Sequence, residues 1–107
     1  MTKVQEYFAT GESGYVEISG GVVSVIGGLG STKEIGEIGY VEVSIEHPEQ
    51  MLGISRAEHI MLFNESNEEL HDDQNMIDNT EYNSDKELIE EIAKRYGISQ
   101  DIIEIIE

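Results

Sequence analysis

Carboxylate side chains are the residues of this chain whose number and spacing could do chemistry. The sequence has 23 Asp and Glu but only 6 Lys and Arg in 107 residues, and its formal net charge is −17. Five of these acids lie between residues 65 and 73, near the spacing that places side chains on one side of a helix. A closely spaced row of carboxylates can bind a basic protein surface, and it can also draw that surface in from a distance.

The candidate partner-binding residues lie in the second half of the chain, where the charge is most negative. Residues 1–63 hold 9 acids and 3 bases, whereas residues 64–107 hold 14 acids and 3 bases. The net charge is therefore −6 in the first segment and −11 in the second. The candidates are ten acids and one tyrosine: Glu65, Glu68, Glu69, Asp72, Asp73, Asp78, Glu81, Tyr82, Glu87, Glu90 and Glu91.

Other kinds of site are not indicated by the sequence. There is no cysteine, which excludes thiolate zinc sites and thiol nucleophiles. The acids that begin at Asp72 lack the glycine and the final glutamate of a calcium-binding loop. The glycine-rich residues 27–33 lack the P-loop pattern, and the three histidines have no spacing typical of metal ligands. We therefore expect no enzyme activity, no cofactor and no metal.

Length and charge also limit the possible partners. A chain of 107 residues is expected to form a single domain over residues 1–107. No window approaches the roughly 18 apolar residues of a membrane span, and the first residues do not resemble a signal peptide. Anionic lipid and nucleic acid would both repel so acidic a surface. We expect a cytoplasmic protein whose partner is a basic protein surface, with no membrane and no direct nucleic-acid contact.

Residues 14–63 have the pattern of an antiparallel sheet of three to four strands. Apolar and polar residues alternate on both sides of Gly20 and Gly21, and this dipeptide suits a two-residue turn that needs positive φ. The expected register creates two facing apolar pairs: Ile18 with Val23, and Val16 with Val25.

A second strand of the same kind is predicted because the pattern of residues 14–19 returns at residues 39–44. Val41, Val43 and Ile45 form its inner row, and Pro48 stops it. The apolar run at residues 59–63 fits either a central strand or a buried turn of helix.

Residues 64–107 are predicted to be an acidic helical half with two to three helices, so the expected class is α+β. Ser66 and Glu69 match a capping box, and residues 64–87 should form a weakly held helix or an extended acidic loop. The clearest helix is capped by Ser84 and ends at Gly97. Ser99 would then cap a second, short helix that carries the last isoleucines.

The last two predicted helices resemble a helix-turn-helix, in which a small residue lies at the helix crossing and a glycine makes the turn. The resemblance is carried by Ile92, Ala93, Tyr96, Gly97, Ile98, Ile103 and Ile106. Residues 99–107 contain no Lys or Arg, so this unit is expected to pack or to form a homodimer rather than to bind DNA. A regulatory or assembly protein is therefore one alternative.

By size, acidity and lack of cysteine or catalytic motifs, the chain resembles the small acidic phage-encoded inhibitors of the anti-CRISPR and DNA-mimic type. The resemblance is compositional, so no functional residue is carried over from it. It implies a non-enzymatic inhibitor that blocks the basic nucleic-acid-binding surface of a nuclease or defence effector in the host cytoplasm. An immunity-type inhibitor of a toxin nuclease would use the same electrostatics and is a second alternative.

Overall fold

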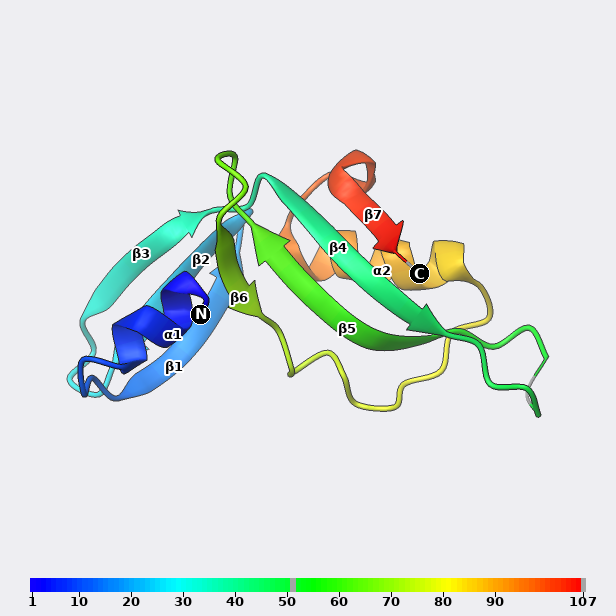
Figure 1. Ribbon diagram of the computed structural model, residues 1–107, viewed down its shortest axis with the longest axis horizontal. Helices are drawn as coiled ribbons and strands as arrows, with labels where there is room; N and C mark the ends of the chain where they lie inside the picture. Colours follow the sequence, from blue (N-terminus) through cyan, green and yellow to red (C-terminus); the bar gives the residue numbers. More distant parts are fainter. Residues whose placement is uncertain (51, 107) are drawn as a thin grey trace.

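The computed structural model describes residues 1–50 and 52–106, which form two β-sheets accompanied by helices (Figure 1). The α+β class is therefore confirmed. The three-stranded sheet has the order β1-β2-β3 and contains β1 (Gly14–Ser19), β2 (Val22–Gly27) and β3 (Thr32–Glu37). The four-stranded sheet has the order β6-β5-β4-β7 and contains β4 (Tyr40–Glu46), β5 (Arg56–Phe63), β6 (Glu69–Asp72) and β7 (Ile103–Ile106).

The helices lie at both ends of the chain. Helix α1 (Lys3–Phe8) precedes the three-stranded sheet, and α2 (Asp85–Tyr96) follows β6. A single 3-10 turn, η1 (Gln100–Ile102), joins α2 to β7. None of the helices in the described part of the chain is long and apolar enough to cross a membrane.

The first hairpin has the predicted register. Ile18 pairs with Val23, and Val16 pairs with Val25. Gly20 and Gly21 have φ values of 58° and 76°, the left-handed values that a two-residue primed turn requires. Sequence alternation and turn chemistry were therefore enough to predict this unit.

The repeat of that strand pattern is β4, whose Val41 and Val43 are fully buried. Residues 59–63 belong to β5, which lies between β4 and β6, so the central-strand interpretation is confirmed. The number of strands was underestimated, because residues 14–63 form five strands in two sheets. The unpredicted strand is β3, an edge strand whose sequence TKEIGE is too polar to show a clear alternation.

The helix predicted from the capping box at Ser66 is wrong. The side-chain oxygen of Asn64 instead accepts hydrogen bonds from the backbone amides of Ser66 and Glu68, each at 2.9 Å. Asn67 adopts a left-handed φ of 63°, so the chain turns back into β6 as a hairpin. Residues 73–83 form the extended acidic loop that was the other alternative.

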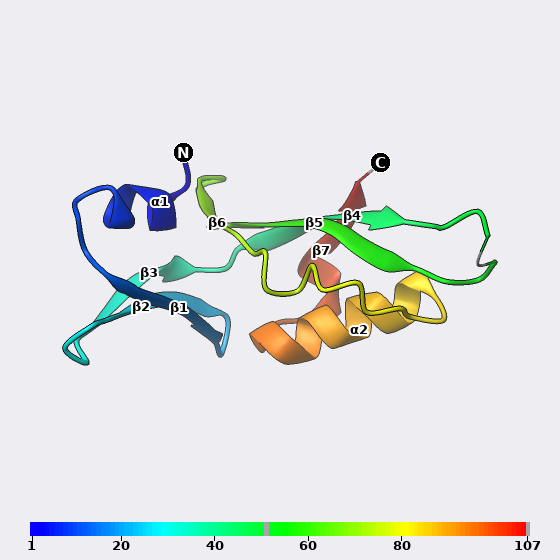
Figure 2. The ribbon, with the colours of Figure 1, turned by 90° about the horizontal axis from the view of Figure 1, so that it is seen from below.

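Helix α2 has the predicted ends. The Ser84 hydroxyl accepts a hydrogen bond from the Glu87 amide at 3.1 Å, and Gly97 closes the helix with φ 70°. One face of α2 covers the four-stranded sheet (Figure 2). The core there contains Leu88, Ile92 and Tyr96 from the helix and Val41, Val43, Ile60 and Leu62 from the strands.

The predicted helix-turn-helix and the two to three C-terminal helices are wrong. After Gly97 the described chain has only the turn η1, and Ile103–Ile106 then form β7, which pairs in parallel with β4. Isoleucine favours strands, and the open edge of β4 offers these residues backbone hydrogen bonds that a short isolated helix cannot match. The predicted homodimer would use two C-terminal helices, but the described C-terminal residues provide only α2.

One buried cluster contains residues from both sheets and both helices, including Val4 of α1 and Val23 of β2. The Gly20-Gly21 turn of the three-stranded sheet contacts the end of α2, which packs on the four-stranded sheet. There the Gly21 amide donates to the Tyr96 carbonyl at 2.7 Å. The prediction that residues 1–107 are a single domain stays a prediction.

This junction is testable at Gly97. A Cβ atom at Gly97 would lie 2.9 Å from the backbone nitrogen of Gly20 and would also be strained by φ 70°. Gly97→Ala should lower the free energy of unfolding by more than the roughly 1–3 kcal/mol of a left-handed backbone alone. Gly30→Ala is the control, because Gly30 has φ 82° with no atom within 4 Å of its Cβ position. If urea denaturation shows that Gly97→Ala and Gly30→Ala lower the free energy of unfolding by the same amount, this would contradict a close contact at Gly97.

Candidate functional site on the acidic surface

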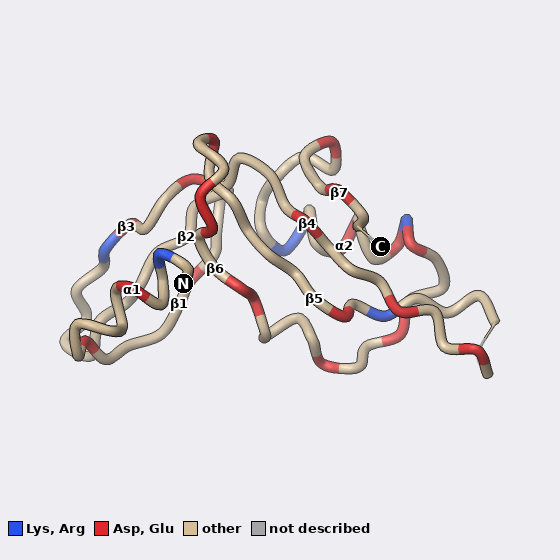
Figure 3. The backbone as a smooth tube through the Cα atoms, viewed as in Figure 1, with Lys and Arg blue, Asp and Glu red and all other residues tan. Residues whose placement is uncertain are grey.

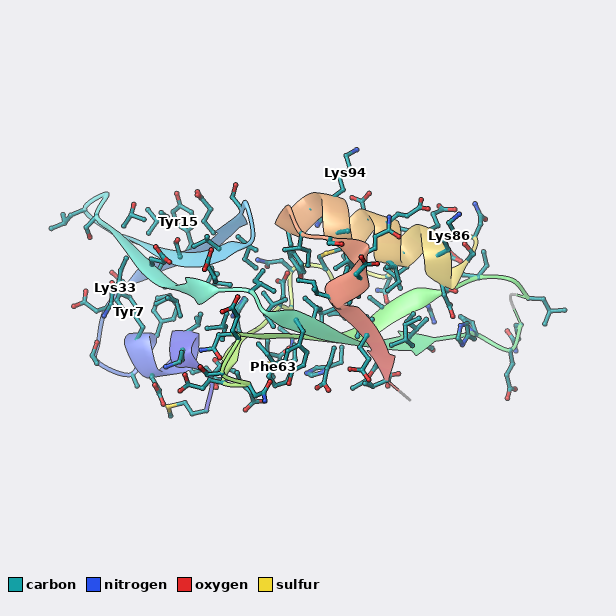
Figure 4. All side chains as sticks on the ribbon, turned by 90° about the horizontal axis from the view of Figure 1, so that it is seen from above. Tyr7, Tyr15, Lys33, Phe63, Lys86 and Lys94 are labelled. Atoms are coloured by element: carbon teal, nitrogen blue, oxygen red, sulfur yellow. The ribbon has the colours of Figure 1, made fainter. Side chains whose placement is uncertain are left out.

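Basic side chains neutralise little of the acidic surface. Four of the six Lys and Arg residues form ion pairs with carboxylates: Lys3 with Glu68 at 3.3 Å, Arg56 with Glu46 at 3.1 Å, and Lys86 with Glu90 and Arg95 with Glu91, each at 3.8 Å. Lys33 instead lies 5.5 Å from the centre of the Tyr7 ring (Figure 4). Most of the 22 acids within the described residues therefore have no Lys or Arg partner.

The negative charge is spread along an elongated molecule, which measures 45 × 24 × 22 Å between Cα atoms. Figure 3 shows acidic residues along the whole length. Without Glu107, which lies outside the described residues, the net charge of −17 becomes −16. Dividing the 45 Å length by 16 gives about one net charge per 2.8 Å, compared with one per roughly 1.7 Å in duplex DNA.

Four of the predicted acids lie together on the hairpin formed by β5, its turn and β6. Glu65, Glu68 and Glu69 are exposed, and Asp72 is half-buried. The Asn64 amide at 3.0 Å and the Lys3 ammonium at 3.3 Å lower the pKa of Glu68. The predicted row along one side of a helix does not exist, because these acids project from a hairpin.

Asp73 was predicted to contact a partner, but it is buried, with only 3 % of its surface exposed. Its carboxylate accepts hydrogen bonds from the Tyr96 hydroxyl and, at 3.0 Å, from the Asn75 amide. Burial and the neighbouring Asp73 carboxylate raise the pKa of Tyr96, and burial lowers the pKa of His71, which lies 4.0 Å from Asp73. Asp73 therefore ties β6 to α2 and is not available to a partner.

Three further candidates lie in the loop between β6 and α2. Asp78 and Glu81 are exposed, and the Asp78 carboxylate accepts a hydrogen bond from the Thr80 amide at 3.1 Å. Tyr82 is half-buried against the core and exchanges backbone hydrogen bonds of 2.8 and 2.9 Å with Ser55. Burial, followed by the charge of nearby carboxylates, raises the Tyr82 pKa. Tyr82 therefore holds the loop in place, and its backbone pairing could not be foreseen from its residue type.

The last three candidates lie on α2, away from the face that covers the sheet. Glu87 and Glu90 are exposed, and Glu91 is half-buried. The structure thus places the exposed candidates in three consecutive groups, on the β5–β6 hairpin, on the following loop and on α2. Whether a partner binds them stays a prediction.

Sequence reasoning missed a second group, on the outer face of the four-stranded sheet. Tyr40 and Phe63 are stacked there, with ring centres 4.4 Å apart and planes 2° from parallel. Glu42 lies beside Glu104 in the parallel register of β4 and β7. The alternation of residues predicts that Tyr40 and Glu42 share one face of the strand. Their neighbours Phe63 and Glu104 could not be predicted, because they depend on the β4–β5 register and on β7, which was predicted to be helical.

A third polar cluster is centred on Asp85, the first residue of α2. The Ser55 hydroxyl donates to Oδ1 of Asp85 at 2.6 Å, and the Nε2 atom of His47 lies 2.7 Å from the same oxygen. These hydrogen bonds lower the pKa of Asp85. In a Ser-His-Asp triad the histidine lies between the other two residues. Here the aspartate lies between the serine and the histidine, so the cluster lacks the order of a triad. It joins both ends of the loop between β4 and β5 to helix α2.

No group of three His, Asp or Glu within residues 1–50 and 52–106 has a geometry that could hold a metal ion. Comparisons with protein-family models, with curated proteins and with solved structures find no match for this chain. The candidate function therefore rests on geometry and charge.

The buried Asp73–Tyr96 contact can be tested with Tyr96→Phe. Removing the hydroxyl leaves a buried carboxylate oxygen without its donor, which should cost about 1–3 kcal/mol of unfolding free energy. Tyr15→Phe is the control, since Tyr15 is 61 % exposed and its loss should be below about 0.5 kcal/mol. Equal urea midpoints for the two variants would refute the anchoring role.

The Asp85 cluster predicts a specific pH dependence. Because the folded-state pKa of Asp85 is lowered, its stabilisation is present above the unfolded value of about 3.9 and is lost as the pH falls through the lowered value. Asp85→Ala should therefore cost about 1–3 kcal/mol at pH 7, partly by leaving the buried Ser55 hydroxyl without its partner. Asp85→Asn keeps an acceptor oxygen, so it should lower the free energy of unfolding by less than Asp85→Ala does.

The measurement is the urea midpoint of each variant between pH 7 and pH 2.5. The gap between the wild-type protein and either variant should narrow below about pH 4. A gap that stays constant over this range would show that the Asp85 charge is not the stabilising element.

Proposed function

We propose that this protein is a non-enzymatic acidic inhibitor that occupies the basic nucleic-acid-binding surface of a nuclease or defence effector. The observation that supports the proposal best is its uncompensated negative charge, −16 over the described residues of a molecule 45 Å long. This linear charge density is within about twofold of that of duplex DNA. A groove lined with Lys and Arg would therefore attract the protein much as it attracts nucleic acid.

The expected mechanism is competition for the same cations. Charge complementarity speeds encounter, with association rates that can reach about 10⁸ M⁻¹s⁻¹ at low salt. The exposed acids of the β5–β6 hairpin, the loop and α2 project from three neighbouring segments of the chain. Together they can replace several phosphates at once, which would leave the target's groove closed to its substrate.

The compositional resemblance to anti-CRISPR and DNA-mimic proteins supports the same proposal, and from it we further propose that the protein acts in the cytoplasm of the host cell. An immunity-type inhibitor of a toxin nuclease would have a different target but would bind it by the same electrostatic attraction. A panel of purified targets therefore separates the two: RNA-guided nucleases, restriction nucleases and toxin nucleases, each with a fluorescent duplex as substrate.

The proposal predicts that the protein displaces the duplex from at least one nuclease of this panel. Fluorescence anisotropy at 50 mM NaCl should show displacement, and the apparent affinity should fall by at least tenfold at 500 mM, because screening shortens the reach of the charges. Failure to displace the duplex from every nuclease, or an affinity that does not change with salt, would contradict the mechanism.

Charge reversal locates the contact surface. The triple variant Glu68→Lys, Glu69→Lys and Asp72→Lys should weaken inhibition by tenfold or more. The control reverses three exposed acids of the other sheet and its flanking loop, Glu12, Glu17 and Glu34, with the same change in net charge. If both triple variants lose affinity equally, the total charge matters and not the β5–β6 hairpin.

A further inference from the structure

The outer face of the four-stranded sheet is not covered by α2, and α1 lies beside its edge strand β6. Helix α2 lies on the opposite face, and Figure 4 places Phe63 on the side away from it. Strand alternation and register bring Tyr40, Glu42, Met61 and Phe63 to this outer face. Among the described residues, none of these four belongs to the core or packs against it. The face therefore presents a sheet surface without a partner, at the centre of the fold.

Its centre is the stacked Tyr40–Phe63 pair, which carboxylates surround on three strands. Glu69 of β6 is in register with Phe63, and Glu104 of β7 lies beside Glu42 of β4. Burial, followed by the charges of Glu42, Glu104 and Glu69, raises the Tyr40 pKa, as expected for three carboxylates close to this ring. The aromatic pair and the acids thus form one surface, here called the outer-face patch (Tyr40, Glu42, Phe63, Glu69 and Glu104).

The chemistry of the outer-face patch selects its occupant. Arg56, at the far end of this face, is already paired with Glu46 at 3.1 Å, so the patch remains anionic. A second copy of the same face would bring like charges together, and nucleic acid would be repelled. A guanidinium group combines a charge for the carboxylates with a flat face that stacks on aromatic rings, whereas an ammonium group offers only the charge.

We propose that the outer-face patch is the docking site for arginine side chains of the basic partner, which stack on the Tyr40–Phe63 pair and form ion pairs with Glu42, Glu69 and Glu104. This inference rests on the proposed function, and it adds the surface and the residue type that are recognised. Tyrosine and arginine are enriched among the residues that dominate binding energy at interfaces. The outer-face patch would therefore add aromatic stacking to the charge attraction, which by itself mainly speeds encounter.

The test uses two fluorescein-labelled probes, a nonamer of arginine and a nonamer of lysine, at 100 mM NaCl. The wild-type protein should bind the arginine peptide at least threefold more tightly than the lysine peptide. Amide chemical-shift changes on adding the arginine peptide should concentrate in β4, β5 and β7. Phe63→Leu, which keeps an apolar side chain but removes the aromatic ring, should reduce the arginine preference to about one.

Charge neutralisation provides the second arm. Glu42→Gln with Glu104→Gln should weaken arginine-peptide binding by fivefold or more. The matched control is Glu12→Gln with Glu17→Gln, two exposed acids on or beside the three-stranded sheet, which changes the net charge equally and should weaken binding by no more than twofold. Circular dichroism checks that each variant is folded, and the conservative Glu→Gln changes keep the test valid if Phe63→Leu is unstable.

The outcomes separate this inference from the proposed function. If both peptides bind equally well and both Glu→Gln pairs weaken binding to the same extent, the patch is not the docking site, although an acidic inhibitor remains supported. Shift changes confined to residues 73–91, which lie outside the outer-face patch, would overturn the inference in the same way. If neither peptide binds at 100 mM NaCl, both proposals fail.

Discussion

Tyr96 connects the main parts of this fold through one side chain and one carbonyl group. Its ring is buried in the core between α2 and the four-stranded sheet, and its hydroxyl donates to the buried Asp73 at the end of β6. Its carbonyl accepts the Gly21 amide from the first hairpin. Contacts with Tyr96 thus hold both sheets and the acidic loop in place. Buried polar groups are costly unless they are paired, so this network also favours a single arrangement.

This arrangement lets a small protein carry a large uncompensated charge. The acids that repel one another lie on a hairpin, a loop and the outer side of a helix, where water screens them, while the apolar residues form one buried cluster. Local hydrogen bonds hold the most acidic segments in shape, such as those from the amides of Ser66 and Glu68 to Asn64. The acidic surface therefore needs few salt bridges to keep its form.

Much of the local structure could be predicted from the sequence wherever a short-range rule applied. The Gly20-Gly21 turn set the register of the first hairpin, and Ser84 and Gly97 marked the ends of α2. The errors came where the deciding contacts are long-range. Residues 103–106 have a helix-like polar cap before them, yet they pair with β4, and Ser66 matches a capping box while Asn64 makes a turn.

The candidate site shows the same division. Exposure of Glu87 and Glu90 on α2 follows from helical spacing alone, whereas the burial of Asp73 depends on Tyr96, 23 positions further along the chain. The Tyr40–Phe63 pair depends on strand register, and the proximity of Glu42 and Glu104 depends on a strand that was not predicted. Composition therefore predicts only the charge sign of the proposed partner, whereas the surface proposed to bind it depends on three-dimensional pairing.

The parallel pairing of β4 with β7 has a consequence for the order in which the molecule is assembled on the ribosome. Strands β1 to β3 are neighbours in sequence and can pair as soon as they emerge, but the edge of β4 stays open until Ile103–Ile106 have been synthesised. Such distant pairings fold slowly and leave strand edges exposed in the meantime. During that interval, mutual repulsion among nascent acidic chains would protect the unfinished sheet from aggregation.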